Sequence, residues 1–166
     1  MLRKIEDFQK DWAYEIDMTG KVLTTLTDES LGQKVNEGGR TLGFLGWHLT
    51  QSLGELLGLA GLKIDAPAAD MGCPASAAEI AAAYEKAANS VIEQVRANWT
   101  DETLLKTDEM YGETWARGLT LFLLITHQAH HRGQMTVLMR QAGLAVPGVY
   151  GPAKEEWIAM GAPVLK

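Results

Sequence analysis

Three of the four histidines in this chain lie inside one long apolar stretch, residues 119–142. The length and composition of this stretch predict a single helix. His127 and His131 are four residues apart, so on a helix their side chains are separated by about 40° around the axis and by about one turn along it. At that spacing, two imidazole rings can face the same ion. The fourth histidine, His48, lies in a second apolar stretch, residues 42–59, which also has helical spacing.

We interpret His48, His127 and His131 as a metal site of three ring nitrogens inside a helical core. Neutral imidazole is the commonest protein ligand of transition metals. Three protein ligands leave positions open for water or substrate, which is typical of a catalytic site. The competing interpretations are hydrogen-bonded core histidines and a histidine-rich surface stripe. Helix geometry also leaves His130 open as an alternative to His131, because His130 lies about 60° from His127 on the other side.

One common type of zinc enzyme is not expected. The spacing of His127 and His131 matches the zinc-protease motif H-E-x-x-H, but Gln128 stands where that motif has its glutamate. The glutamate acts as the general base of such peptidases. The sequence therefore argues against a zinc peptidase of this type.

The composition predicts one globular domain over residues 1–166. The chain has 166 residues, of which 46% are hydrophobic and 22% charged, enough to bury a core. Its net charge of −6 and the lack of a basic run argue against nucleic acid as a partner. The single cysteine, Cys73, excludes an internal disulfide. The charged N-terminus is unlike a signal peptide, and the apolar run 119–126 is too short to span a bilayer, so we expect a cytoplasmic protein with no membrane segment.

Helical periodicity predicts four long helices. They are expected at residues 5–26, 42–59, 77–98 and 114–142. Ser76 and Glu79 form a capping-box pattern at the start of the third helix, and Gly143 is expected to end the fourth. Residues 99–112 are polar and irregular, and are predicted to form a loop or turn. A short helix is expected at residues 153–160, within the tail 143–166.

These elements predict an all-α fold. Four helices joined by short or medium-length connections are typical of an antiparallel four-helix bundle. No stretch alternates between apolar and polar residues with a period of two, so strands are not expected. The first half of the fourth helix is apolar on nearly all sides, which indicates that it is central or covered by a second subunit.

The histidine-containing block resembles a known family. Residues 127–134 read H-x-x-H-H-R-G-Q, and they follow a histidine in the second helix and precede Leu138-Met139-Arg140-Gln141-Ala142-Gly143, as in the DinB/YfiT-like superfamily. The resemblance extends from the first helix to Gly143 and does not include the tail. It implies an up-down-down-up four-helix bundle, often a homodimer, that binds Zn, Ni or Fe through the residues matching His48, His127 and His131. It thus favours His131 over His130.

The resemblance leaves more than one function open. Superfamily members of known activity include thiol S-transferases and isomerases that use a low-molecular-weight thiol, whereas others are known only as DNA-damage-induced or stress proteins. Our first hypothesis is a metal-dependent enzyme that acts on a small molecule, a cellular thiol in a transferase or another substrate in a hydrolase. The second is a non-catalytic stress-response bundle that dimerises through apolar residues away from the histidines, such as Leu121, Ile125 and Met139.

Other polar and aromatic residues are weighed for roles at or away from the candidate site. Glu55, two turns after the histidine of the second helix, either orients a ligand or is a solvated surface charge. Gln134, one turn beyond the last histidine, either binds a ligand or makes a contact between helices. Arg132 points away from the metal-binding face and is expected to be structural or interfacial. Cys73 is given no nucleophilic role. The large aromatic residues are expected in core or dimer packing rather than in a pocket: Trp47, Trp115, Tyr150 and Trp157.

Overall fold

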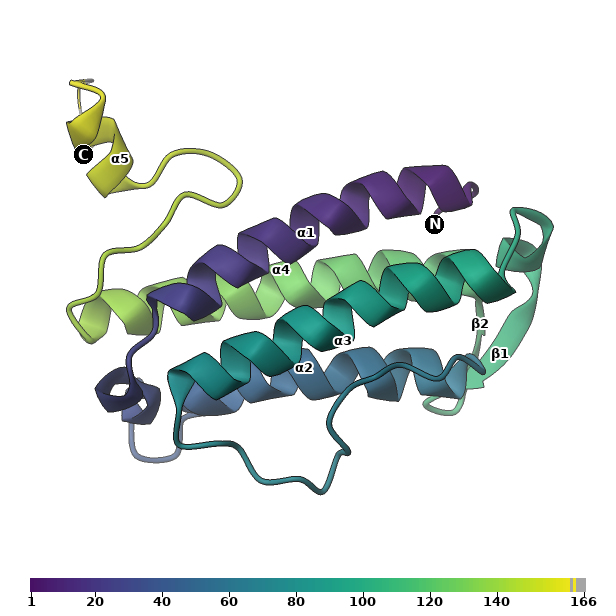
Figure 1. Cartoon of the computed structure of the whole chain (residues 1–166), viewed down its shortest axis with the longest axis horizontal. Coiled ribbons are helices and arrows are strands. Elements are labelled where there is room, and N and C mark those ends of the chain that lie inside the picture. Colours follow the sequence, from purple (N-terminus) through teal and green to yellow (C-terminus); the bar gives the residue numbers. More distant parts are fainter. Residues whose placement is uncertain (162, 164–166) are drawn as a thin grey trace.

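Four long helices lie side by side and make up most of the molecule (Figure 1). The computed structural model describes residues 1–161 and 163. In chain order, its elements are α1 (Ile5–Thr25), the 3₁₀ helix η1 (Asp28–Gly32), α2 (Leu42–Leu59), α3 (Ala77–Asn98), the 3₁₀ helix η2 (Glu102–Leu105), β1 (Thr107–Met110), β2 (Glu113–Ala116), α4 (Arg117–Gln141) and α5 (Lys154–Ala159). The expectation of a mainly helical chain is therefore confirmed, including the short helix in the tail.

The long helices surround a shared apolar core. α1 contacts α3 and α4, and α2 contacts the same two helices. In Figure 1, α1 and α4 run in one direction along the molecule, whereas α2 and α3 run in the other. The indole Nε1 of Trp12 donates a hydrogen bond of 3.0 Å to the carbonyl of Ala88, which fixes α1 against α3. Many side chains of the core are fully buried, among them Phe8, Trp12, Leu49, Leu53, Ile80, Val91, Leu121 and Leu124. Burial of each large apolar side chain contributes about 1.5–3 kcal/mol.

The helix ends follow the signals in the sequence. The hydroxyl of Ser76 accepts a hydrogen bond from the backbone N–H of Glu79, so Ser76 is the predicted N-cap of α3. The reciprocal bond of the predicted capping box is not formed among the described residues. At the other end of the chain, Gly143 has a φ of +75° and donates its N–H to the carbonyl of Arg140. Glycine adopts this left-handed conformation without strain, which explains why α4 ends there.

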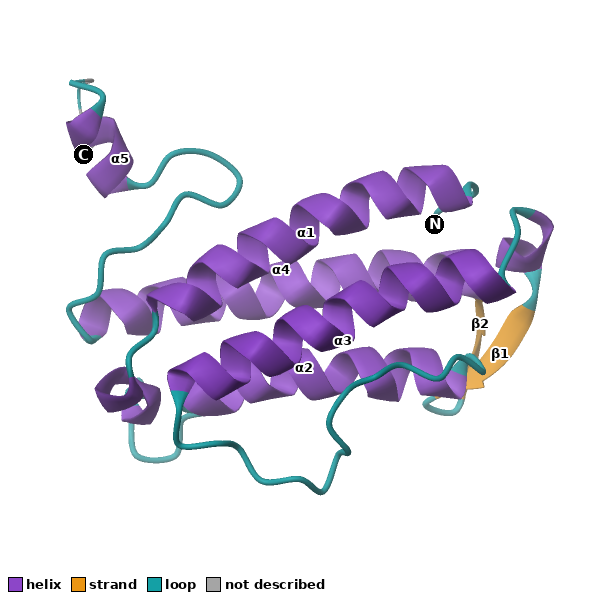
Figure 2. Ribbon diagram, viewed as in Figure 1, coloured by secondary structure: helices purple, strands orange, loops and turns teal. Residues whose placement is uncertain are grey.

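A β-hairpin follows η2, and the prediction that the chain has no strands was wrong. β1 and β2 pair antiparallel, with Met110 opposite Glu113, and they stand at one end of the helices (Figure 2). Tyr111 and Gly112 form the turn with φ values of +52° and +83°. Positive φ at both central residues is typical of the type I′ turn, whose twist matches that of the strands. Strands of four residues each are too short to show a clear alternation.

The hairpin also changes where the fourth helix begins. The predicted start, Thr114, lies in β2, so α4 begins later, at Arg117. The guanidinium of Arg117 donates to both carboxylate oxygens of Asp108, at 2.9 and 3.1 Å. Arg117 also lies over the ring of Trp99, 4.9 Å from its centroid. These contacts fasten the hairpin to the start of α4.

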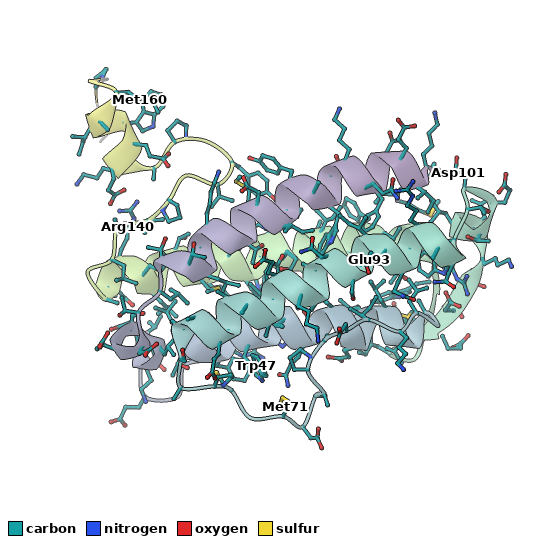
Figure 3. All side chains as sticks on the ribbon, viewed as in Figure 1. Trp47, Met71, Glu93, Asp101, Arg140 and Met160 are labelled. Carbon is teal, nitrogen blue, oxygen red and sulfur yellow. The ribbon has the colours of Figure 1, made fainter. Side chains whose placement is uncertain are left out.

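The long connection between α2 and α3, residues 60–76, is held against α2. The indole of Trp47 donates a hydrogen bond of 2.9 Å to the carbonyl of Met71, and both residues are labelled in Figure 3. The side-chain amide of Gln51 donates to the same carbonyl at 3.0 Å. Among the residues that the structure describes, no helix is both long and apolar enough to cross a bilayer.

A buried ion pair joins α1 to α4 and to the tail. Arg132 is 1% exposed and Glu15 is 4% exposed, and their charged groups are 2.5 Å apart. Arg132 also donates to the hydroxyl of Thr19 at 2.8 Å. The phenol of Tyr150 accepts from Arg132 at 2.7 Å and donates to Glu15. The structural role expected for Arg132 is thus confirmed, and Tyr150 packs against this pair within the chain.

Replacing the buried arginine is expected to destabilise the fold strongly. Arg132→Leu leaves the carboxylate of Glu15 buried without its cation, which costs about 3–5 kcal/mol. Arg140→Leu is the matched control, because Arg140 pairs with Glu155 at the surface, and an exposed pair contributes less than about 1 kcal/mol. Urea denaturation followed by circular dichroism gives the loss in free energy of unfolding for both variants. Equal losses in the two variants would contradict this account of the buried pair.

Candidate metal centre

The three histidines singled out in the sequence come together between α2 and α4. His48 lies on α2, and His127 and His131 lie one turn apart on α4. The Nε2 atom of His127 is 3.2 Å from that of His48 and 3.1 Å from that of His131. One ligand atom from each residue lies within 4.8 Å of the other two, and the site is partly to fully buried. This group of three can hold a metal ion.

The spacing of the three nitrogens fits a metal better than it fits hydrogen bonds among themselves. A neutral imidazole has one N–H, so three Nε2 atoms that face one another cannot all be satisfied by mutual hydrogen bonds. Two nitrogens bound to zinc at about 2.0–2.1 Å in tetrahedral geometry are about 3.3 Å apart. The observed separations, 3.1 and 3.2 Å, are close to that value. A cation between the three rings would therefore find its ligands almost in place.

Gln134 determines which nitrogen of His131 faces the cluster. The Nδ1 atom of His131 is 2.8 Å from Oε1 of Gln134, and an amide oxygen can only accept, so Nδ1 carries the proton. The Nε2 atom of His131 then has a free lone pair directed toward the other two histidines. The amide nitrogen of Gln134 lies 3.2 Å from Nε2 of His130 and donates to it. In the structure, the polar contacts of Gln134 are with His131 and His130 of its own helix rather than between helices, and through the first of them it orients the ring of His131.

Burial and mutual repulsion favour the neutral form of all three rings. Burial is the main cause that lowers the pKa of His127 to about 4, and the charges of His131 and His48 lower it further. Burial also lowers the pKa of His48, followed by repulsion from His131 and Arg40. The pKa of His131 falls for the same main reason, partly offset by its hydrogen bond to Gln134. Neutral imidazole is the form that binds metals, so the site is ready to do so at neutral pH.

Two residues that the sequence analysis did not single out, Phe44 and Arg40, pack beside His48. The ring of Phe44 stacks on that of His48, with centroids 6.0 Å apart. The guanidinium of Arg40 lies over the ring of Phe44, 5.1 Å from its centroid. Gln128, which stands where zinc peptidases have a glutamate, is fully buried and donates its amide to the carbonyl of Leu49 at 3.2 Å. It joins α4 to α2 beside the histidines.

A pocket of about 550 Å³ opens next to the histidine cluster. Its volume is in the range of small-molecule sites. His48 and His127 belong to its lining, and the hairpin contributes Tyr111 and Trp115. The full lining is His48, Ser52, Glu55, Leu56, Tyr111, Trp115, Leu123, Thr126, His127 and His130. A largely apolar cavity thus borders a group of metal-ligand side chains.

The remaining candidates divide between this pocket and other places. Glu55 is exposed, as the sequence indicated, but it also accepts a hydrogen bond of 2.8 Å from the phenol of Tyr111. Trp115 lines the pocket, although core or dimer packing had been the expected role of the large aromatics. His130 lines the pocket and does not belong to the group of three. Cys73 is exposed and donates to the carbonyl of Gly43.

The three imidazoles are expected to make the metal-free protein sensitive to mild acid. Above about pH 6.5, the rings are neutral in both the folded and the unfolded chain, so they add no pH dependence. Below that pH, the histidines of the unfolded chain become protonated, whereas His127 in the folded chain stays neutral down to about pH 4. Stability should therefore fall progressively between these values. Urea denaturation as a function of pH measures this loss, and His127→Gln should flatten the curve. An identical pH dependence in the variant would contradict this role of His127 in the loss of stability.

Proteins of similar sequence and fold are known for almost the whole chain. A model of the DinB family matches residues 1–162. YrdA of Bacillus subtilis (strain 168), described as uncharacterized, is 46% identical over 161 residues, or 97% of this chain and 96% of YrdA. The crystal structure of a DinB-like protein from Bacillus cereus ATCC 10987 has a TM-score of 0.87 at 44% identity, over 90% of this chain and 100% of that chain. The DinB-like protein YjoA from Bacillus subtilis has a TM-score of 0.67 at 16% identity, over 86% and 96%, a likeness of fold alone. This chain belongs to the DinB family.

Proposed function

We propose that His48, His127 and His131 bind one divalent transition metal, Zn, Ni or Fe, and that the protein is a metal-dependent enzyme acting on small molecules. The observation that carries this proposal is the convergence of three Nε2 atoms, 3.1 and 3.2 Å apart, beside a pocket of about 550 Å³. Three protein ligands leave room for a fourth from the substrate. The preferred reaction is transfer of a low-molecular-weight thiol to a small electrophile.

The chain's own residues would prepare the site for such a reaction. A divalent ion held by the three rings supplies positive charge that favours the thiolate form of a substrate thiol. Gln134 keeps the Nε2 lone pair of His131 directed inward. Leu56, Leu123 and Trp115 line the pocket and offer apolar surface to a substrate. In the transfer, the new bond joins sulfur to the electrophilic carbon, and the leaving group and the thiol proton depart.

Hydrolysis is the alternative reaction, and the surroundings of the histidines support it less. A metal-dependent hydrolase benefits from a carboxylate that accepts a proton from water. Gln128 is an amide already bonded to Leu49, and the carboxylate of Glu55 is bonded to Tyr111 two turns along α2 from His48. No carboxylate belongs to the histidine group within the described part of the chain.

We also propose the finer features of the fold that the family resemblance implies. The helix directions in Figure 1 support an up-down-down-up four-helix bundle forming a single domain over residues 1–166. A homodimer remains our expectation, but Leu121 and Met139, two of the residues expected at its interface, are fully buried in the core of the chain. The exposed apolar side chains Phe122 and Val137 on α4 support a dimer in their place. These side chains are also the observation that favours the second candidate function, a non-catalytic stress-response bundle. A cytoplasmic location stays a prediction from the sequence.

Removing any one of the three ligands is expected to abolish metal binding. Purified without a histidine tag, the protein should contain about one divalent ion per chain, because three imidazoles form one site. His48→Ala and His127→Ala should each reduce the metal content to near zero after dialysis. Mass spectrometry of the metal gives the content, and incubation with a cellular thiol and a reactive electrophile gives the transfer rate.

His130→Ala is the matched control for these variants. It removes a fourth imidazole from the same helix and the same pocket, but not from the group of three. Its metal content should equal that of the unmodified protein. Negligible metal in the unmodified protein after supplementation would refute the metal centre. Full metal content without any thiol transfer would refute the reaction and retain the metal centre.

Gln134 is expected to raise the affinity for the metal without binding it. Gln134→Leu removes the acceptor for Nδ1–H of His131, so the ring can rotate or adopt the other tautomer. Loss of such a supporting contact typically weakens metal binding by about 10- to 100-fold. Gln134→Glu keeps an acceptor and should bind the metal at least as well as the unmodified protein. Competition with a chromophoric chelator measures both affinities, and an unchanged affinity in Gln134→Leu would contradict the role.

A further inference from the structure

The end of the pocket away from the histidines has features that suit a positively charged ligand. Glu55 lies seven residues after His48 on α2, which places it about 10 Å further along the helix. Tyr111 and Trp115 of the hairpin line the same pocket, with ring centroids 5.8 Å apart and planes inclined at 53°. A carboxylate and two tilted aromatic rings therefore meet at this end of the pocket.

Apart from the histidines, the polar groups of the lining use their own protons in hydrogen bonds within the protein. The hydroxyl of Ser52 donates its proton to the carbonyl of Leu49, and that of Thr126 donates to the carbonyl of Leu123, each at 3.1 Å. The phenol of Tyr111 donates to the carboxylate of Glu55. The hydroxyl protons are thus used within the protein, and the oxygen lone pairs remain for a ligand. Such a lining favours hydrogen-bond donors and cations over anions.

The charge and the rings at this end have no cationic partner among the described residues. Glu55 takes part in none of the ion pairs of the described chain. The arginines that lie over aromatic rings do so at Phe44, Trp99 and Tyr150, and not at Tyr111 or Trp115. Trp115 also donates its indole N–H to the carboxylate of Glu113 at 2.8 Å, which places a second negative charge at the ring edge. An organic cation is the ligand that this arrangement complements.

We propose that Glu55, Tyr111 and Trp115 form a site for an organic ammonium group, and that the substrate of the proposed metal enzyme carries such a group about 10 Å from the atom that meets the histidines. Cations over the faces of Trp and Tyr are attracted by the ring quadrupole. The carboxylate of Glu55 adds charge attraction, and the aliphatic walls, Leu56 and Leu123, accommodate the apolar body between the two ends. The assignment of this ligand as substrate rests on the proposed function, whereas cation binding by itself does not.

The first experiment measures cation binding on the full-length protein, both metal-free and metal-loaded. Choline is titrated by calorimetry against its uncharged isostere, in which carbon replaces the quaternary nitrogen. Choline should bind roughly tenfold more tightly than the isostere. Glu55→Gln retains an acceptor for Tyr111 but loses the charge, and should weaken choline binding about three- to fivefold. Trp115→Leu should weaken it as well.

Glu93→Gln is the matched control for the charge change. Glu93 is exposed on α3, lies outside the pocket lining and is labelled in Figure 3. This variant should bind choline as the unmodified protein does. Equal affinity for choline and its isostere would overturn the proposal, and so would the absence of choline binding or equal weakening by Glu93→Gln and Glu55→Gln.

The second experiment separates the cation site from the metal centre. Aminoalkanethiols of increasing length are compared with hydroxyalkanethiols of equal length on the zinc-loaded protein. Affinity should favour the amines most where the two ends are about 10 Å apart, and Glu55→Gln should remove that preference. Choline binding by a protein that takes up no metal would refute the proposed function and retain the cation site. Metal uptake without any preference for the amines would refute the ammonium-bearing substrate.

Discussion

The convergence of three imidazoles between α2 and α4 is the constraint on which the rest of the site depends. Uncompensated polar nitrogens in a partly buried place cost free energy, because they lose hydrogen bonds to water. The ring nitrogens of His48, His127 and His131 face one another, and Nδ1 of His127 is buried with no partner within the described residues. A fold with such a cluster has the candidate ligands arranged in advance. A bound cation would offset the free-energy cost of the unpaired nitrogens.

The relative position of α2 and α4 is held by contacts that do not themselves bind the metal. Gln128 bridges the two helices beside the cluster. On another side of α4, Arg132 is paired with Glu15 on α1. Gln128 and Arg132 adjoin the candidate ligands in sequence but point in other directions. α4 therefore presents the candidate ligands on one side and its contacts with neighbouring helices on the others. The precision of the centre therefore derives from α4 being fixed on several sides.

The sequence was sufficient to predict the helices and the three histidines, because both depend on local spacing. Period-3.6 patterns and caps such as Ser76 and Gly143 act within a few residues. His48 and His127 were identified from their positions in two apolar helical stretches, and the family resemblance favoured His131 over His130, which helix geometry had left open. The structure brings these three together, while metal binding by them remains a proposal.

The hairpin and the pocket could not be predicted in the same way. Each strand has four residues, and the turn uses Tyr111 rather than the asparagine or aspartate that usually marks such a turn. The contacts of Glu55 with Tyr111, and of Arg132 with Tyr150, join residues far apart in the chain. Long-range contacts of this kind leave no periodic signal. The role of Gln134 was missed for another reason, since it depends on the side-chain conformation of His131.

The docking of Tyr150 onto the Glu15–Arg132 pair has a consequence for how the molecule is made. Glu15 is synthesised 135 residues before Tyr150, whose phenol completes its hydrogen bonds. Until that phenol arrives, the two charges must either stay hydrated or be enclosed without one of their partners. α1 and α4 therefore gain the full stabilisation of this ion pair only after residue 150 has been synthesised.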